Sequence, residues 1–315
     1  MVPVIPARED ERVQRFAISV AAAANKGGAM LMGTAMAVYI GRKGSPLAVS
    51  LVAAVFFFGQ MVFSPVWGAI ADVTGNRRAV LIGTAFLATL SILPLLAVDG
   101  VWAPLGFRGL YAVFAAGFLP VMLTIVAERG GADSRGRSIG FFSSAQAVGF
   151  TMGQFFAGVL LGLLIPWSLY LMVAAVSAVV VLSAVVIDDP TPPVGTEFSR
   201  AAVVAEVRNR LFPRVGDRAH LRTNGLQWLY VAILLRNMTV IGTGSLMPIY
   251  LVSEVGTSEF LMGVLLAINP AAQMAFMYAT GWLTDRFGRR PLVIGGMASS
   301  RVYGLIMAAA ILPGT

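Results

Sequence analysis

Two long apolar segments of the chain are joined by Gly68-Ala69-Ile70-Ala71-Asp72-Val73-Thr74-Gly75-Asn76-Arg77-Arg78. A second copy of this pattern reads Gly281-Trp282-Leu283-Thr284-Asp285-Arg286-Phe287-Gly288-Arg289-Arg290. In each copy an Asp ends one apolar segment, a Gly follows, and a pair of Arg residues opens the next segment. The Gly permits a sharp reversal of the backbone. The Asp can pair with the following Arg residues or face the N-terminus of the next helix. We therefore expect a tight turn at a membrane face in both places.

The composition predicts a membrane protein. Apolar residues make up 57% of the chain and charged residues only 12%, whereas about a quarter of the residues of an ordinary soluble domain are charged. The mean hydropathy is +0.81, and several apolar runs exceed the ~20 residues that a helix needs to cross a bilayer. The fold class that we expect is an all-α multi-pass membrane protein.

We expect about nine spanning helices, each long enough to cross the bilayer at ~1.5 Å of rise per residue. The Arg residues fall mainly in alternate loops, as the positive-inside rule requires, and this predicts a cytoplasmic N-terminus. The same rule explains the net charge of +8 without nucleic acid. The predicted spans are Phe16–Ile40, Leu47–Ile70, Ala79–Val98, Leu105–Ala127, Ile139–Leu164, Ser168–Ile187, Leu226–Val252, Phe260–Leu283 and Leu292–Leu312.

The spans divide the chain into two unequal halves. We expect an N-terminal six-helix bundle over 1–187, a cytoplasmic linker over 188–225, and a partial C-terminal bundle of three helices over 226–315. Within the linker, apolar residues recur at helical spacing between Arg residues, which suits an amphipathic helix on the inner membrane surface. A solvated connector between two bundles suits the segment equally well. The apolar positions are Phe198, Val203, Val207 and Leu211.

The two halves also repeat one another. Gln60-Met61 precedes Asp72 at the same separation at which Gln273-Met274 precedes Asp285. Parallel repeats of this kind, related by an axis along the membrane normal, occur in one large class of secondary transporters.

The paired Asp–Gly–Arg turns resemble the signature loop of the major facilitator superfamily between helices 2 and 3, with its echo between helices 8 and 9. The resemblance covers essentially the whole chain. It implies a fold of twelve helices, of which the last three are absent here, and transport of a small solute by alternating access. It also implies that the turns form a cytoplasmic latch, although a static turn remains the alternative. The latch residues are Gly68, Asp72, Gly75, Arg77, Arg78, Gly281, Asp285, Gly288, Arg289 and Arg290.

All charged residues deep within the expected spans are cationic, and we find no Asp or Glu well inside any span. Polar residues within a membrane are costly and mark functional sites by default. Cations at the bilayer midplane attract carboxylates or phosphates, so we expect a central cavity for an anionic or zwitterionic organic compound. The alternative is that these side chains bind helix carbonyls and hold the halves together. The candidates are Lys26, Arg236 and Arg301, with Asn25, Gln60, Asn237 and Gln273 as hydrogen-bonding groups.

Two further motifs bear on transport. Arg108, followed by small residues and Pro120, resembles the superfamily's helix-4 motif, which implies a role in proton or substrate coupling. An Arg that snorkels to the outer interface is the alternative. Small residues in the fifth span permit close helix packing and resemble the helix-5 motif of the antiporters, but Gln154 replaces its Pro and weakens the case for antiport. The packing residues are Gly149, Gly153 and Gly158.

The sequence contains no cysteine, and its only histidine, His220, lies in a polar loop. Because no cluster of His, Cys or paired carboxylates lies inside the spans, we expect neither an enzyme nor a metal site nor a cofactor. No phosphate-binding Gly-x-x-x-x-Gly-Lys-Ser/Thr loop is present, so we expect an ion gradient to drive transport, with the proton as a candidate coupling ion. Because no carboxylate lies inside the spans to carry a proton, a uniporter or an exchanger is the alternative. The expected partners are a small-molecule substrate and the bilayer of the plasma membrane. Multidrug/proton efflux and a non-transporting receptor or assembly partner remain alternatives.

Overall fold

The structure is a computed structural model that describes residues 8–98, 100–163, 166–190, 199–212, 226–287, 291–299 and 302. The described part is built from helices and contains no strand, which confirms the predicted all-α class. Residues 291–299 are helical as well, and the rest of the expected ninth span lies mostly outside the described residues. The elements are α1 (Arg8–Lys43), α2 (Pro46–Thr74), α3 (Arg77–Leu90), η1 (Leu93–Leu96), α4 (Trp102–Ala115), α5 (Phe118–Arg129), α6 (Gly131–Leu163), α7 (Pro166–Val186), α8 (Arg200–Leu211), α10 (Leu226–Ile249), η3 (Tyr250–Glu254) and α11 (Glu259–Phe287).

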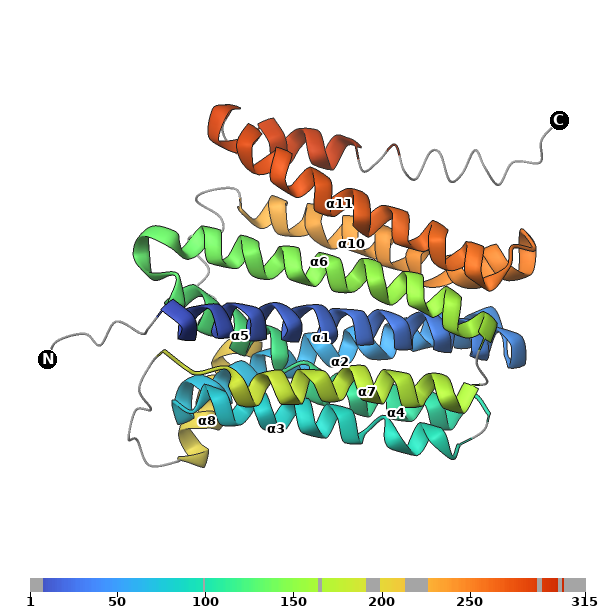
Figure 1. The fold of residues 1–315 in the computed structure, drawn as a ribbon, viewed down its shortest axis with the longest axis horizontal. Helices are drawn as coiled ribbons and strands as arrows, with labels where there is room; N and C mark the ends of the chain where they lie inside the picture. Colours follow the sequence, from blue (N-terminus) through green and yellow to red (C-terminus); the bar gives the residue numbers. More distant parts are fainter. Residues whose placement is uncertain are drawn as a thin grey trace, which may run out of the picture.

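Six stretches of the described chain are long and apolar enough to cross a membrane. They coincide with six of the expected spans, and α1 and α11 run alongside them (Figure 1). The six stretches are Pro46–Thr74, Arg77–Leu96, Trp102–Arg129, Ser134–Leu163, Ser168–Val186 and Leu226–Glu254.

Prolines divide two of the spans into shorter helical pieces. A proline has no N–H to donate, and its ring collides with the carbonyl group four residues earlier. Pro120 therefore interrupts the fourth span near Ala116, where α4 ends and α5 begins. Pro94 likewise ends α3 at Leu90, and the short 3₁₀ helix η1 completes that span. The expected single helices are thus each made of two pieces in line.

The helix α1 lies at the centre of the bundle, packed between α6 and α7 (Figure 1). Its Met32, Met36 and Ile40 side chains are completely buried. The helix α3 packs against α7, and α4 packs against α2. The helix α11 packs along α6. The C-terminal half is therefore attached to the N-terminal half through α6, with a smaller contribution from α1 and α2 to α10.

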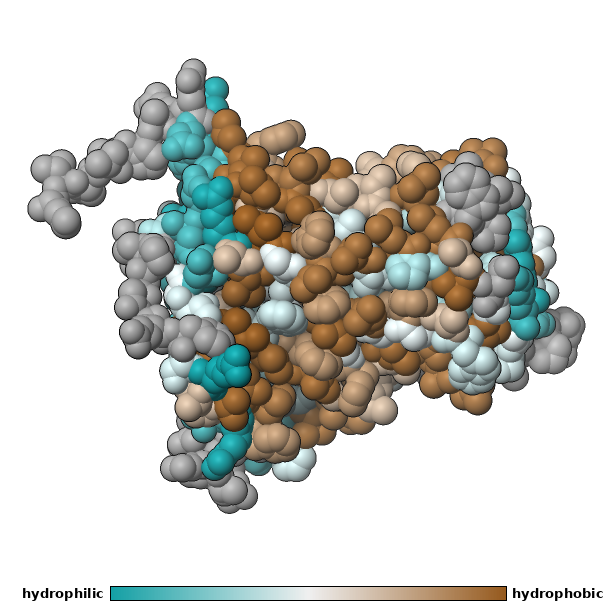
Figure 2. Space-filling model, turned by 90° about the horizontal axis from the view of Figure 1, so that it is seen from below, coloured by the Kyte–Doolittle hydropathy of each residue, from teal (hydrophilic) through white to brown (hydrophobic). Residues whose placement is uncertain are grey.

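The bundle has two polar ends separated by a broad apolar belt (Figure 2). We call the end that carries the α2–α3 turn, the end of α5 and the helix α8 the basic end, because Arg77, Arg78, Arg129 and Arg210 lie there. The opposite end carries the α1–α2 turn. An apolar belt between two polar bands is the surface of a protein that spans a membrane.

The first copy of the signature stretch forms the predicted tight turn. Gly75 follows the end of α2 with a φ of 62°, a left-handed conformation that only glycine adopts without strain. Asn76 then caps α3, and its side chain accepts a hydrogen bond from the backbone N–H of Ala79 at 3.1 Å. In the second copy Gly281 and Asp285 lie in α11. Their surroundings, and all of 288–290, lie outside the described residues, so that turn stays a prediction.

Candidate functional site

Asp72, at the end of α2, binds a residue of the linker helix. Its Oδ2 accepts a hydrogen bond from Nη2 of Arg210 in α8 at 2.7 Å. Arg77, one of the partners expected from the sequence, lies farther away, with its Nη2 3.8 Å from Asp72 Oδ1. Gly68 lies one turn earlier on α2, and a Cβ there would come within 2.9 Å of Arg210 Nη1. The motif glycine therefore makes room for a guanidinium that the motif itself does not contain.

Arg210 is held by two carboxylates. It donates a second hydrogen bond from its Nε to Glu206 Oε1 at 2.8 Å, one turn earlier in α8. Burial of the guanidinium by itself lowers the pKa of Arg210, but the hydrogen bonds to Asp72 and Glu206 outweigh it and raise the pKa overall. Arg210 therefore keeps its charge at any working pH. No local pattern predicts this contact, because the two partners are 138 positions apart in the chain.

The paired Arg residues that follow the turn bind acidic groups of neighbouring helices. Arg77 Nη1 donates to Glu128 Oε2 at the end of α5 at 2.6 Å. Arg78 Nη1 donates to Asp188 Oδ1, just beyond α7, at 2.8 Å. Gln14 of α1 bridges the backbone of Val186 and the carboxylate of Asp188 through its side-chain amide. The turn thus fastens α1, α3, α5 and α7 together at the basic end.

The two halves meet at the opposite end. Arg42 of α1 forms an ion pair with Glu259, the first residue of α11. The Phe155 ring on α6 lies edge-on to the Phe260 ring, with the ring centres 6.2 Å apart. Gly158 of α6 faces Gly263 of α11 so closely that a Cβ on either residue would collide with the other backbone. This end of the contact between the halves is consequently tightly packed.

The contact between the halves weakens towards the basic end. Figure 1 shows α11 diverging from α6 in the direction of the end at which α8 lies. The first half of α10 is also uncovered by the described residues, with Trp228 70% and Leu235 60% exposed. In contrast, Pro248 near its far end is buried. The described halves are therefore joined at one end and separate towards the other.

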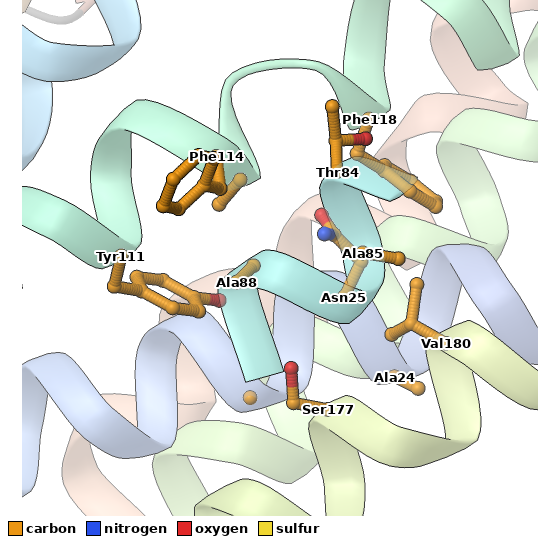
Figure 3. Close-up of a pocket in the computed structure, with 12 residues that line it drawn as sticks. Ala24, Asn25, Thr84, Ala85, Ala88, Tyr111, Phe114, Phe118, Ser177 and Val180 are labelled. Carbon is orange, nitrogen blue, oxygen red and sulfur yellow. The ribbon is translucent and has the colours of Figure 1, made fainter. Parts of the chain in front are cut away.

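The two polar neighbours in the middle of α1 face different surroundings. Asn25 lines a cavity of about 10 Å³ inside the N-terminal half, beside Thr84, Tyr111 and Ser177 (Figure 3). That volume is close to the room that one water molecule requires. Lys26 points instead towards α6, where its Nζ lies 5.7 Å from the centre of the Phe150 ring. Among the described residues it has no carboxylate partner, and an aromatic face is a weaker substitute for one.

Arg108 is buried inside the N-terminal half. Its side chain is only 3% exposed, which shows that the snorkelling alternative was wrong. The rotation of α4 directs the guanidinium onto the Phe56 ring, with the Arg108 Cζ 4.2 Å from the ring centre. The Nη2 of Arg108 donates a hydrogen bond to the Ala29 carbonyl of α1 at 3.3 Å. Its Nε and Nη1, and the hydroxyl of Tyr170, find no hydrogen-bond partner in the described part of the chain. A buried cation without a counter-charge is costly, so this is an unusual arrangement for a purely structural residue.

The other expected cavity residues are not joined to Lys26 by any hydrogen bond within the described ranges. Arg236 is exposed on α10 and Asn237 is half-buried. Gln60 donates to the Ala112 carbonyl of α4 at 3.4 Å, and Gln273 bonds to Asn269 one turn earlier on α11. Arg301 lies outside the described residues.

Comparison with known proteins identifies the family. Residues 18–315 match the Major Facilitator Superfamily. The chain belongs to that superfamily. Among curated proteins it is 25% identical over 256 residues to the multi-drug resistance efflux pump PmrA of Streptococcus pneumoniae serotype 4, which covers 80% of this chain and 61% of PmrA. It is 34% identical over 67 residues, 18% of this chain and 15% of the relative, to the inner membrane transport protein YajR of Escherichia coli K12.

Solved transporters of the superfamily share the fold. A bacterial homologue of the human lysosomal transporter Spinster, crystallised in an inward-facing and unoccupied conformation, superposes with a TM-score of 0.68 at 17% identity. The match covers 90% of this chain and 64% of that one. The nucleoside transporter NupG gives a TM-score of 0.62 at 15% identity, over 87% and 68% of the two chains. The present chain thus spans about three fifths of the length of PmrA and about two thirds of the length of these two transporters of known structure.

Within this superfamily member, the helix-5 glycines serve two different contacts. Gly149 and Gly153 face Ala23 and Gly27 of α1, whereas Gly158 faces α11. Gln154, which replaces the proline of the antiporter motif, accepts a hydrogen bond from the Thr34 hydroxyl of α1 at 2.6 Å. The substitution therefore adds a polar tie between α1 and α6 to their close backbone packing.

Proposed function

We propose that this chain is a secondary transporter that moves a small solute across the plasma membrane by alternating access, with its basic end in the cytoplasm. The observation that carries the proposal is the unequal contact between the halves, which are packed together at the opposite end and diverge towards the basic end. Two bundles that rock about a central site need such a contact at one end at a time. The excess of Arg at the basic end supports its cytoplasmic placement.

The substrate that we propose is an anionic or zwitterionic organic compound. Lys26 and Arg108 are largely buried cations that have no carboxylate partner in the described part of the chain. The spans contain no acidic residue well inside them. A substrate carboxylate or phosphate would offset the cost of holding these charges within the membrane. Arg108 would act from the interior of the N-terminal half, and Lys26 from the side of α1 that faces α6.

We further propose that the Asp72–Arg210 contact is part of the latch that alternating access breaks and reforms. Both side chains lie at the basic end, and the linker helix α8 supplies the Arg. Because α8 belongs to the segment that connects the two halves, a movement of the halves would pull on this ion pair directly. A static turn, in contrast, would leave transport unchanged when Asp72 loses its charge.

Multidrug efflux is the second candidate, and the similarity to PmrA favours it. The two candidates differ in the charge of the compound that is bound. An efflux pump for lipophilic cations has no use for unpaired cations near its binding site, whereas an anion carrier depends on them.

The experiment that tests the proposal is flux of radiolabelled solutes into proteoliposomes, with a panel of small carboxylates and a panel of lipophilic cations. We expect uptake of a carboxylate that is lost in Lys26→Gln. The matched control is Lys43→Gln, which removes the same charge from the exposed end of α1. Uptake of lipophilic cations alone would favour efflux. Absence of flux for both panels, in a protein that remains folded, would contradict transport.

A further inference from the structure

The linker helix α8 and Val66 of α2 line an open apolar groove outside the helix bundle. Its volume is about 400 Å³. Aliphatic and aromatic side chains line it, and the single charged lining residue among those described is Arg208. The lining residues are Val66, Val203, Val204, Val207, Arg208, Leu211 and Phe212.

The groove lies where the apolar belt approaches the basic end of the bundle. Arg210 ties α8 to Asp72 at the end of α2, so α8 is held at the boundary between the apolar belt and the basic end. Figure 1 places α8 beside the basic ends of the spanning helices, and Val66 lies six residues before Asp72 on the spanning helix α2. With the apolar belt taken as the part of the protein within the hydrocarbon core, the groove would open near the level at which acyl chains meet their headgroups.

The rim of the groove carries the charge of Arg208. Arg208 forms no ion pair with any residue that the structure describes, whereas its neighbour Arg210 has two carboxylate partners. Phe212 is 76% exposed and Val204 65% exposed, although both would be buried by an apolar occupant. An apolar slot with a free cation at its rim is complementary to a molecule with an acyl chain and an anionic head.

We propose that this groove binds an anionic glycerophospholipid of the inner leaflet. One acyl chain would lie between Val66 and the valine face of α8, with its end against Phe212, and the phosphate would pair with Arg208. A soluble phosphate would not need the apolar walls, and a zwitterionic lipid would gain less from Arg208. The site is formed by α8 together with Val66 of α2. The proposal rests on the proposed cytoplasmic placement of the basic end, but not on transport.

The test is native mass spectrometry of the purified chain with phosphatidylglycerol and with phosphatidylcholine of identical acyl chains. A single Arg near a membrane surface contributes ~1 kcal/mol to the binding of anionic lipid, so we expect about fivefold preferential retention of phosphatidylglycerol. Arg208→Gln should abolish that preference. The control Arg200→Gln removes the same charge from the same helix at an exposed position outside the groove and should keep it.

A second variant tests the apolar part of the site. Phe212→Ser should lower the retention of both lipids, because it opens the end of the groove without changing the charge. Equal preference in Arg208→Gln and Arg200→Gln would overturn the proposal, since it would show a diffuse charge effect. Competition by inorganic phosphate at the same concentration as the lipid would also overturn it, because it would identify a soluble anion as the occupant.

Discussion

The contact between α1 and α6 predicts opposite effects for two Gly→Ala substitutions within one helix. A Cβ on Gly149 would lie 2.6 Å from the Ala23 Cα and 2.7 Å from the Ala23 carbonyl carbon, both of them backbone atoms. Backbone cannot rotate out of the way as a side chain can, so the helices would have to separate. A Cβ on Gly140, nine residues earlier in α6, meets no atom within 4 Å.

The expected magnitudes follow from two opposing contributions. Alanine is favoured over glycine in a helix interior by about 0.5–1 kcal/mol, and this gain applies to both positions. Overpacking of a tight contact costs about 1–3 kcal/mol, and this cost applies only to Gly149→Ala. We therefore expect Gly140→Ala to be slightly more stable than the parent and to exceed Gly149→Ala by about 1–3 kcal/mol in the free energy of unfolding.

The assay is thermal unfolding in detergent, followed by tryptophan fluorescence, for the parent and both variants at the same protein concentration. The midpoint of Gly149→Ala should fall several degrees below that of Gly140→Ala. Equal midpoints for the two variants would refute the reasoning, because they would show that α6 does not approach α1 at Gly149. A fall in the midpoint of Gly140→Ala would show instead that this part of α6 is covered.

Three further predictions concern the ends and the interior of the bundle. The Asp72 side chain is 42% exposed, so a double-mutant cycle with Asp72→Asn and Arg210→Gln should give a coupling free energy below about 1 kcal/mol in stability. Each single variant should nevertheless slow the flux into liposomes, and unchanged flux would count against the latch. Because the chain has no cysteine, the double variant Arg42→Cys with Glu259→Cys contains only the two introduced thiols. A short bifunctional thiol reagent should cross-link them, which mass spectrometry would detect, and should stop the flux; full transport after cross-linking would contradict alternating access. Arg108→Met removes a buried cation that has no carboxylate partner among the described residues. Its thermal stability should therefore equal that of the parent or exceed it by about 1 kcal/mol, while uptake is lost; intact uptake would exclude Arg108 from coupling.

The features that depend on neighbours along the chain can be predicted from the amino-acid sequence. The spans follow from apolar runs of bilayer length, and the turn at Gly75 follows from a glycine placed between two such runs. The glycines of the fifth span likewise predict close helix packing, because the lack of a Cβ atom is a property of the residue itself. The family could be recognised for the same reason, since its signature is a contiguous stretch.

Which side chains meet across the bundle depends on how the helices pack. The rotation of α4 places Arg108 in the interior instead of at the interface, and the rotation of α1 sends Asn25 and Lys26 into different surroundings. Arg210 reaches Asp72 because the linker folds back against α2, which no periodicity along the chain encodes. The rotation of a helix about its axis and the path of a linker depend on the packing of the whole bundle. The residue pattern of a single, uniformly apolar membrane helix determines neither of them.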